Sequence, residues 1–381
     1  MKVITTERIP VKLWLDDIED GALSQAMDLA KLKFAFKHIA IMPDSHLGYG
    51  MPIGGIMATD QVIVPNAVGV DIGCGMTAIK SNIKVEDMPE EELKRIMGEM
   101  RKEVPVGFAH HKEKQEWEGF DKAPDIEIIQ KELENAKYQL GTLGGGNHFI
   151  EIQKGDDGFV WVMLHSGSRN FGLKTATEYH NKAKKICERW LSDIPNDDLS
   201  FLPMDSPEGQ DYFKAMNFAL DFAFANRKLM MSRIVDIIGE SHFEWDKLIN
   251  IHHNYATMEN HFGKNVLVHR KGATKATAGL TGIIPGSMGT SSYITEGLGN
   301  PESFMSSSHG AGRKMGRGDA IRSLNLEDEQ KKMTGIVHGL RNKQNLDEAP
   351  GAYKDINVVM ENQKDLVKIV TELKPMAVIK G

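Results

Sequence analysis

Residues that can bind a metal ion or take part in phosphate chemistry follow several short apolar runs of this sequence. Metal ligands and catalytic groups often lie at the ends of rigid elements, where side chains project into loops. A single histidine at such a place is more often structural, but several ends of this kind in one chain favour a shared site. The residues are Asp44 and His46 after IAIMP, Asp71 and Cys74 after VIVPNAVGV, His165 after FVWVML, and His252 and His253 after LINI.

The chemistry of these side chains indicates a particular kind of metal. Imidazole, thiolate and carboxylate together suit manganese, zinc or ferrous iron, whereas a magnesium or calcium site would be nearly all oxygen. Local ligand pairs such as C-x-x-C or H-x-x-x-H are absent, so the site must be assembled from distant segments, as catalytic sites are. Asp71 and Cys74 lie three residues apart in a glycine turn and could face one ion. More than one carboxylate would permit two adjacent metals, an arrangement favoured for phosphoryl displacement.

Glycine clusters carry most of the remaining polar motifs. The 37 glycines concentrate in GYGMPIGG, DIGCGM, GTLGGGNH, HSGSRNFG, GSMGT and HGAGR. A tight turn explains any one cluster equally well, but six of them, nearly all with His, Cys, Asp or Asn, favour backbone that approaches a phosphate closely. No G-x-x-x-x-G-K-[ST] motif occurs, which excludes a P-loop, and GTLGGGNH does not open a convincing Rossmann unit. Taken alone, His309 in the last cluster is best interpreted as a surface-loop histidine that caps a helix.

The elements that must position these residues alternate irregularly along the chain. Apolar residues at three- and four-residue spacing predict amphipathic packing helices over 88–104, 124–140, 173–193 and 209–240. The methionines and phenylalanines of the last helix are predicted to be core. Short apolar runs predict buried strands. We therefore expect an α+β fold: a single large domain over 1–381, with mixed β-sheets flanked by helices. The predicted strands are HIAIMP, QVIVP, FIEIQ, FVWVML, LINIH and NVLVHR.

Composition limits the class of protein. With 381 residues, 41% of them hydrophobic, the chain can bury a large core. It has no membrane-spanning apolar stretch and no signal peptide at the N-terminus, so we expect a cytoplasmic protein without a membrane partner. Only Cys74 and Cys187 occur, which makes a disulfide framework improbable. The net charge of -7 argues against a general nucleic-acid coat but allows a local basic patch.

Ten motifs, in order from about residue 40 to the C-terminus, resemble those of the RtcB-type RNA ligases. The resemblance therefore covers nearly the whole chain and implies an RtcB-like fold. The opening 35 residues and the helical segments are its least constrained parts. The motifs are MPDSHLGYGMPIGG, VGVDIGCGM, GTLGGGNHFIEI, LHSGSRNFG, HHN, HRKGATKA, IPGSMGTSSYI, SSHGAGR, EAPGAYKDI and AVIKG.

The resemblance implies an enzyme that joins an RNA 3′-phosphate or 2′,3′-cyclic-phosphate end to a 5′-hydroxyl end, with GTP as co-substrate and two manganese ions. His309 is then the nucleophile that takes GMP from GTP, and Asp44 acts near the 5′-hydroxyl end, where His46 can help. The RNA 3′-phosphate takes the GMP, and the 5′-hydroxyl attacks that end and expels it. The implied metal ligands are Asp71, Cys74, His148, His165 and His253. We prefer His253 over its neighbour His252 because the family's histidine directly precedes an asparagine, here Asn254.

The resemblance also implies nucleotide and RNA contacts. A carboxylate such as that of Glu151 can accept hydrogen bonds from the N1–H and 2-amino group of guanine, and Lys380 would donate to the guanine carbonyl. The implied GTP-binding residues are Asn147, Glu151, Ser287, Ser292, Tyr353 and Lys380. The implied RNA-binding residues are Arg169, Lys271, Lys275, Arg313, Lys314 and Arg317. Without the resemblance, these charges would be interpreted as solvated surface.

Two other functions are compatible with parts of the same pattern. One is a manganese-dependent 2′,3′-cyclic phosphodiesterase, which would use the metals but would not need Glu151, Lys380 or His309. The other is a non-catalytic RNA-binding or partner-binding protein that keeps the scaffold. The physiological RNA, whether a transfer RNA in splicing or a damaged RNA in repair, and the need for an accessory activator protein stay open.

Overall fold

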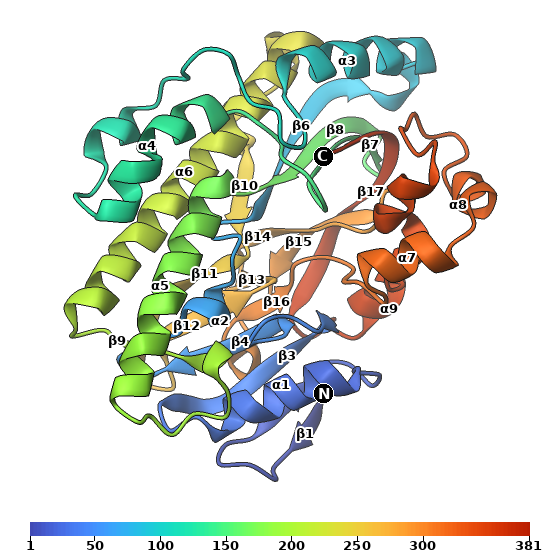
Figure 1. Cartoon of the computed structure of the whole chain (residues 1–381). Coiled ribbons are helices and arrows are strands. Elements are labelled where there is room, and N and C mark those ends of the chain that lie inside the picture. Colours follow the sequence, from blue (N-terminus) through green and yellow to red (C-terminus); the bar gives the residue numbers. More distant parts are fainter.

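The computed structural model describes residues 1–381 as two large β-sheets with helices around them (Figure 1). The first sheet has six strands and is mixed, because β2 and β3 pair in parallel while its other neighbours are antiparallel. It lies in the lower half of Figure 1. Its strands, in spatial order, are β1 (Lys2–Ile4), β2 (Val11–Leu13), β3 (Ala35–His46), β4 (Ile53–Thr59), β12 (Lys264–Lys271) and β11 (Asn254–His261).

The second large sheet has seven strands, and all its neighbouring pairs are antiparallel. Two short pairs, β5 (Val62–Ile63) with β9 (Leu202–Pro203) and β13 (Ala273–Lys275) with β16 (Ser306–Ser308), complete the strands. Mixed sheets were predicted, and one of the two is mixed. The seven strands, in spatial order, are β10 (Ile249–His252), β6 (Gly75–Lys84), β8 (Phe159–Ser166), β7 (Phe149–Gly155), β17 (Val367–Lys380), β15 (Ser292–Gly297) and β14 (Thr281–Ile284).

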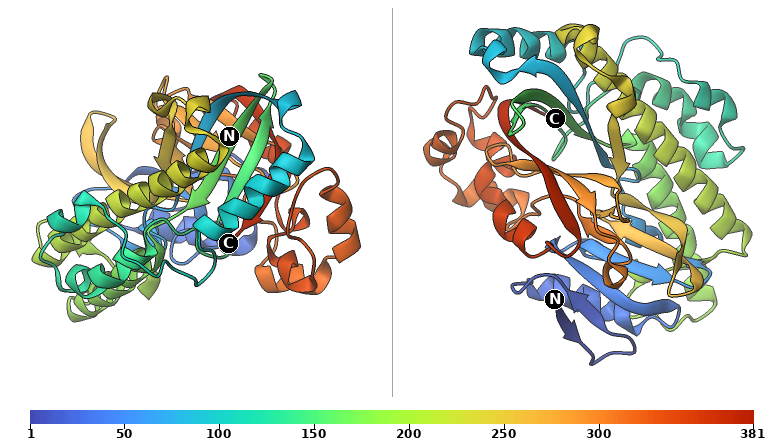
Figure 2. Two further views of the ribbon diagram at one scale, coloured as in Figure 1. Left: turned by 90° about the horizontal axis from the view of Figure 1, so that it is seen from above. Right: turned by 180° about the vertical axis from the view of Figure 1, so that it is seen from behind.

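Helices cover opposite sides of the sheets. Helices α4, α5 and α6 lie along one side, and α7, α8 and α9 lie on the other (Figures 1 and 2). The four helices predicted from periodicity are confirmed as α3 to α6, with ends shifted by a few residues. The nine helices are α1 (Asp20–Lys31), α2 (Pro65–Val68), α3 (Glu90–Glu103), α4 (Glu127–Gln139), α5 (Arg169–Arg189), α6 (Pro207–Ile238), α7 (Arg317–Ser323), α8 (Leu326–Lys332) and α9 (Ile356–Glu361).

The long helix α6 begins and ends where its sequence indicates. The Ser206 hydroxyl accepts a hydrogen bond from the Gly209 N–H at 3.1 Å, and Pro207 occupies the first helical position. The helix ends before Gly239, whose φ is 123°. Its apolar residues are buried, as predicted, against α5 and against the seven-stranded sheet. This packing fixes α6 behind the strand ends that carry the predicted metal ligands.

One predicted strand is largely wrong. Within QVIVP only Val62 and Ile63 pair as a strand, and Pro65 then opens the short helix α2. Proline has no N–H to donate to a sheet and has a helical φ, so it ends the pairing and favours a helix start. The other five predicted strands lie within β3, β7, β8, β10 and β12.

Both cysteines are buried and free, as expected from their isolation in the sequence. None of the helices combines the length and the apolar composition that crossing a bilayer requires.

Candidate active site

A cavity of about 450 Å³ is lined by residues from both large sheets and from the loops around them. Its volume falls in the range of small-molecule sites. Most of the residues predicted to act in catalysis or binding meet here, although they come from segments spread over more than 300 positions. The predicted residues that line it are Asp71, Cys74, Asn147, Glu151, His165, His253, Lys271, Ser287, His309, Arg313, Arg317, Tyr353 and Lys380.

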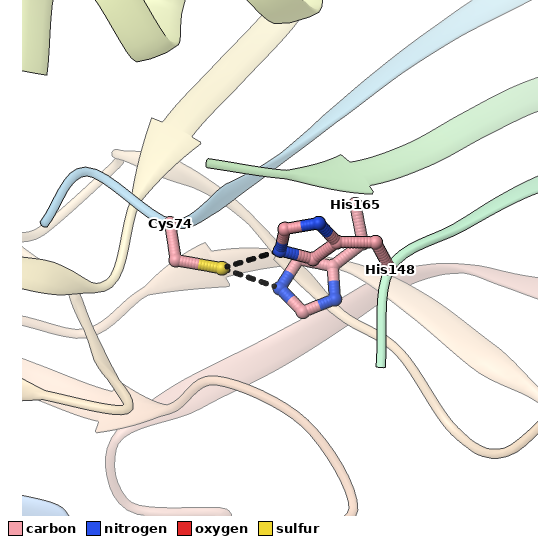
Figure 3. A group of neighbouring side chains, drawn as sticks. All are labelled: Cys74, His148 and His165. Carbon is pink, nitrogen blue, oxygen red and sulfur yellow. Dashed lines mark hydrogen bonds between the residues drawn. The ribbon is translucent and has the colours of Figure 1, made fainter. Parts of the chain in front are cut away.

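Cys74, His148 and His165 form a buried cluster at the cavity wall (Figure 3). The Cys74 Sγ lies 3.1 Å from the His165 Nε2 and 3.5 Å from the His148 Nε2. Strand pairing explains the convergence: Cys74 directly precedes β6, His148 directly precedes β7, and both strands pair with β8, which carries His165. The antiparallel register therefore brings the three side chains to one edge of the sheet.

Two further predicted ligands extend the cluster. The Asp71 Oδ2 lies 3.2 Å from the His148 Nε2, and the His253 Nε2 lies 3.2 Å from the His165 Nε2. The neighbouring His252 points the other way, with its Nδ1 3.0 Å from the Arg227 guanidinium and 3.1 Å from the Gly73 carbonyl. Adjacent strand residues face opposite sides, so only one of the two histidines can join the cluster, and it is His253.

Burial sets the protonation of these groups. Burial lowers the pKa values of His165 and His253 well below the ordinary value, so both imidazoles are neutral, the form that binds metals. Burial also raises the pKa of the Cys74 thiol well above its ordinary value, and the adjacent Asp71 carboxylate adds to this effect. For Asp71 itself burial acts to raise the pKa, but His148, Cys74 and Arg169 together outweigh it and lower the pKa to about 2.

The cluster fits a divalent transition metal. Bond lengths of about 2.3 Å to sulfur and about 2.0 Å to nitrogen in a tetrahedral shell place neighbouring donor atoms about 3.5 Å apart. The observed separations of 3.1 to 3.5 Å among Cys74, His148 and His165 are close to that value. One thiol, three imidazoles and one carboxylate are a donor set for manganese, zinc or iron and not for calcium or magnesium.

His309 lies against this cluster. It directly follows β16, and its ring centroid is 4.7 Å from that of His253. Its Nδ1 is 2.6 Å from the Oδ2 of Asp44, which also accepts the His309 backbone N–H at 3.1 Å. Asp44 is fully buried near the end of β3. With Nδ1 engaged by Asp44, Nε2 is the ring nitrogen free to react.

Two glycines permit this close approach. Gly312 has a φ of +71°, and a Cβ there would lie 2.0 Å from the Asp44 carbonyl oxygen. Gly272 has a φ of +59°, and a Cβ there would lie 2.4 Å from Ile53 and 3.0 Å from the His309 ring. Any larger residue would be strained and would displace the imidazole.

Five of the predicted nucleotide-binding residues line the cavity, namely Asn147, Glu151, Ser287, Tyr353 and Lys380. Glu151 is buried and lines the cavity; burial raises its pKa to about 8, although nearby Lys380 opposes this. Gln153 donates to the Glu151 carboxylate at 2.6 Å and to the Ser292 hydroxyl at 3.2 Å. Ser292 does not line the cavity itself, but its hydroxyl accepts the Gly286 N–H at 3.1 Å and so supports the IPGSMGT loop.

Glu348 organises several of these side chains and was missed in the sequence. Its buried carboxylate accepts from Arg313 and Arg317 at 3.0 Å each, from Lys380 at 3.3 Å, and from the Tyr353 hydroxyl. Burial acts to raise its pKa, but these partners, Lys380 first, lower it to about 2. Its place in EAPGAYKDI was the only available signal, and nothing in that motif indicates that three distant cations share its carboxylate with Tyr353.

The predicted RNA-binding residues separate into two groups. Lys271 is buried at the cavity wall, where burial lowers its pKa to about 7, and Arg169 lies 3.4 Å from the His148 ring. Arg313 and Arg317 line the cavity. Lys275 and Lys314 are not among the lining residues: Lys275 pairs with Glu259 at 3.4 Å, and Lys314 is exposed.

Arg227 is a second residue that the sequence did not reveal. It lies within α6, the helix predicted to supply packing only, and is fully buried without a carboxylate partner. It donates to the carbonyls of Gly73 and Ser166 at 2.8 and 2.9 Å, and so ties together the two strand ends that carry Cys74 and His165. The Asn-Arg pair inside the apolar run AFANRKLMM was the available signal.

Comparisons with known proteins agree with this geometry. The family profile described as "tRNA-splicing ligase RtcB" matches residues 25–123 and 113–381. The "RNA-splicing ligase RtcB" of Escherichia coli (strain K12) is 41% identical over 416 residues, which cover 100% of this chain and 99% of that protein. The "tRNA-splicing ligase RtcB" proteins of Thermococcus kodakarensis and Pyrobaculum aerophilum are each 32% identical over 462 residues, which cover 98% of this chain and 95% of each protein.

Proposed function

The chain belongs to the tRNA-splicing ligase RtcB family and is an RNA ligase, and from this premise we propose that it joins 3′-phosphate or 2′,3′-cyclic-phosphate ends of RNA to 5′-hydroxyl ends with GTP and Mn²⁺. The observation that carries the proposal is the position of His309, held by Asp44 and packed against His253 of the metal-ligand cluster. We further propose that residues 1–381 form a single catalytic domain, since both sheets supply walls of the one cavity.

His309 is the proposed nucleophile. Its neutral ring donates the Nδ1–H to Asp44, so the lone pair on Nε2 is directed away from Asp44. Nε2 attacks the α-phosphorus of GTP, the bond to the bridging oxygen breaks, and pyrophosphate leaves. The positive charge that forms on the ring is stabilised by the Asp44 carboxylate, which is fully buried and therefore acts in a low dielectric.

The remaining steps transfer the same GMP. An oxygen of the RNA 3′-phosphate attacks the phosphorus of guanylyl-His309, and the imidazole leaves. The RNA 5′-hydroxyl then attacks the activated 3′-phosphate, loses its proton and expels GMP. A cyclic phosphate end must first be hydrolysed to the 3′-phosphate.

The metal would be held by Asp71, Cys74, His148, His165 and His253. When bound, it supplies positive charge that stabilises the phosphate oxygens as they gain charge in each transfer. The mixed donor set supports Mn²⁺ as well as zinc or iron, and five donor side chains would suffice for two ions.

The guanine would be held by Glu151 and Lys380. The ionised carboxylate accepts from the N1–H and 2-amino group of guanine, and Lys380 donates to O6, an arrangement that adenine cannot satisfy. Asn147, Ser287, Ser292 and Tyr353 complete the proposed nucleotide site. Arg169, Lys271, Arg313 and Arg317 would contact RNA phosphates at the cavity, and Lys275 and Lys314, which do not line it, would contact RNA outside it.

The test is incubation of the chain with Mn²⁺ and GTP labelled in the α-phosphate, followed by mass spectrometry and by addition of a broken RNA stem-loop with defined ends. We expect an acid-labile, base-stable GMP adduct on His309 and its consumption when RNA is added. His309→Ala abolishes the adduct, whereas His242→Ala, a histidine that contacts Asn82 outside the cavity, retains it.

Two results would contradict this proposal. An adduct retained by His309→Ala would exclude this nucleophile. Hydrolysis of cyclic ends without any uptake of label would identify a phosphodiesterase instead of a ligase. Because the chain is tested alone, the same experiment decides whether an accessory activator is required.

A further inference from the structure

Phe108 is a large apolar side chain that is fully exposed to solvent. Exposed aromatic residues are individually unremarkable when they are mobile, but this one lies on a turn that is held in place. The Gly107 N–H donates to the Gly144 carbonyl at 2.8 Å, and the Ala109 N–H donates to the Val106 carbonyl at 3.1 Å. The ring is therefore presented on a rigid support, so little backbone entropy is lost when a ligand packs on it.

The turn that carries Phe108 adjoins the metal-ligand cluster. The Gly107 carbonyl accepts from the Arg169 Nη2 at 3.4 Å, and the Nη1 of the same guanidinium lies 3.4 Å from the His148 ring. Gly144 has a φ of +88°, and a Cβ there would lie 1.8 Å from the Arg169 guanidinium. Only glycine at position 144 therefore lets Arg169 occupy this place. The Arg169 guanidinium thus contacts both the turn that carries Phe108 and the metal-ligand cluster.

A second exposed aromatic residue, Tyr49, lies on a loop that is also held by a cation at the cavity. Its side chain is 71% exposed, and it lines the cavity mouth. The loop is held because the Tyr49 carbonyl accepts from Lys271 at 2.5 Å, and because Gln25 donates to the Gly48 carbonyl at 2.7 Å. Here too a cation of the proposed RNA-binding set contacts the backbone of the loop that carries an exposed aromatic residue.

We propose that Phe108 and Tyr49 are base-stacking positions for the RNA ends on either side of the break. The inference rests on the proposed function, since it assumes single-stranded RNA at this cavity. Proteins that bind single strands combine cations that hold the phosphates with aromatic rings on which bases stack. The pairs Phe108 with Arg169 and Tyr49 with Lys271 have this composition.

The neighbours of the two rings favour RNA over a protein partner. A protein interface of useful size needs a larger apolar surface around its anchoring residues. Around Phe108 the only large apolar neighbour that is exposed along the chain is Val106, and the exposed lysines and arginines (Arg101, Lys102, Lys112 and Lys114) outnumber the exposed glutamates (Glu103 and Glu113). A surplus of positive charge beside an aromatic ring favours nucleobases and phosphates.

The experiment measures binding of the Mn²⁺-loaded full chain to two single-stranded RNA oligonucleotides, one ending in a 3′-phosphate and one beginning with a 5′-hydroxyl. Stacking of one base predicts that Phe108→Ala and Tyr49→Ala each weaken binding of at least one oligonucleotide by about 5- to 150-fold. Phe108→Trp restores binding and Phe108→Leu does not, because a flat ring is required. Uptake of labelled GMP from GTP without RNA remains at the wild-type level in Phe108→Ala.

The matched control is Leu191→Ala. Leu191 is equally apolar and 90% exposed, but it follows the C-terminal end of α5, whose 21 residues place it roughly 30 Å from Arg169 at the other end. Its removal leaves RNA binding unchanged.

Unchanged RNA binding in both alanine variants would overturn the inference, and the exposed rings would then be assigned to a protein contact. If the wild-type chain still ligates RNA in that case, the proposed function stays intact. A rescue by Phe108→Leu would also overturn it, because general apolar contact would suffice. Failure of the wild-type chain to take up GMP or to bind RNA would refute the proposed function itself.

Discussion

Replacement of Asp44 by asparagine tests the arrangement on which the proposed chemistry depends. The Asp44 Oδ2 lies 2.6 Å from the His309 Nδ1 and also accepts the His309 backbone N–H. Asparagine keeps the size of the side chain and one acceptor oxygen but removes the negative charge. The Asp44 carboxylate accepts from the ring and the backbone of His309, and the Lys354 ammonium, which donates to the flanking Pro43 and Ser45 carbonyls, also interacts with its charge.

The magnitude follows from the kind of contact that is lost. Hydrogen bonds to charged groups contribute about 1.5 to 3 kcal/mol, and the charge on His309 develops only as its Nε2 attacks phosphorus. Since about 1.4 kcal/mol corresponds to a tenfold change in rate, Asp44→Asn should slow guanylylation by roughly 10- to 150-fold. Binding of GTP should change little, because the nucleotide does not contact Asp44 in this arrangement.

The assay is single-turnover transfer of labelled GMP to the protein at saturating GTP and Mn²⁺, with thermal unfolding as a check on the fold. A rate within twofold of wild type in a folded variant would refute the role of Asp44. An equal loss of rate and of GTP affinity would indicate that Asp44 shapes the nucleotide site and does not assist the attack.

Four other substitutions test the site and its support. Cys74→Ser should lower the bound Mn²⁺, measured by elemental analysis, and guanylylation should fall with it; full metal content would contradict the assignment. Arg227→Met removes the charged donor to the Gly73 and Ser166 carbonyls, so the free energy of unfolding in urea should fall by about 2 to 6 kcal/mol, and a change below about 1 kcal/mol would be incompatible with that role. Burial raises the pKa of Glu151 from 4.5 to about 8, so between these pH values the nucleotide-free fold binds one proton more than the unfolded chain does. The free energy of unfolding therefore falls as the pH rises from about 4.5 through about 8. Glu151→Gln should flatten that fall in urea titrations at several pH values, and an unchanged slope would show that the carboxyl is not neutral in the fold. Glu348→Gln removes the charge that holds Arg313, Tyr353 and Lys380, so the affinity for GTP, measured by calorimetry, should fall about tenfold or more, and wild-type affinity would argue against an organising role.

Local pattern was sufficient for the long helices but for only five of the thirteen strands of the two large sheets, namely β3, β7, β8, β10 and β12. Periodic apolar residues predict α3 to α6 because an amphipathic helix depends on spacing within a few turns. The strand β4 was missed because its IGG start lies in a glycine cluster, and the second half of QVIVP was wrong because Pro65 starts α2. In both places neighbours in space decide whether a short segment pairs as a strand.

The candidate site was predicted in outline and completed only by the fold. Motifs at strand ends and a family resemblance indicated Cys74, His165 and His309, but the weak signals at Arg227 and Glu348 did not indicate the contacts that these two residues make. The sequence around Arg227 predicts only a packing helix. Arg227 can donate to the Gly73 and Ser166 carbonyls only because α6 crosses behind β6 and β8. Contacts of this kind join residues more than 60 positions apart, and spacing along the chain does not encode them.

The sequence by itself determined which chemistry is available: a thiol, imidazoles and carboxylates at element ends, glycines that bring backbone close to a ligand, and a pattern shared with the RNA ligases. The tertiary structure brings His253, the histidine preferred from the sequence, to the cluster and turns His252 away from it. It alone decided which nitrogen of His309 is free and which cations reach the cavity. The physical reason is that residue types limit possible bonds, whereas strand register and burial select the atoms that meet and the protonation states they adopt.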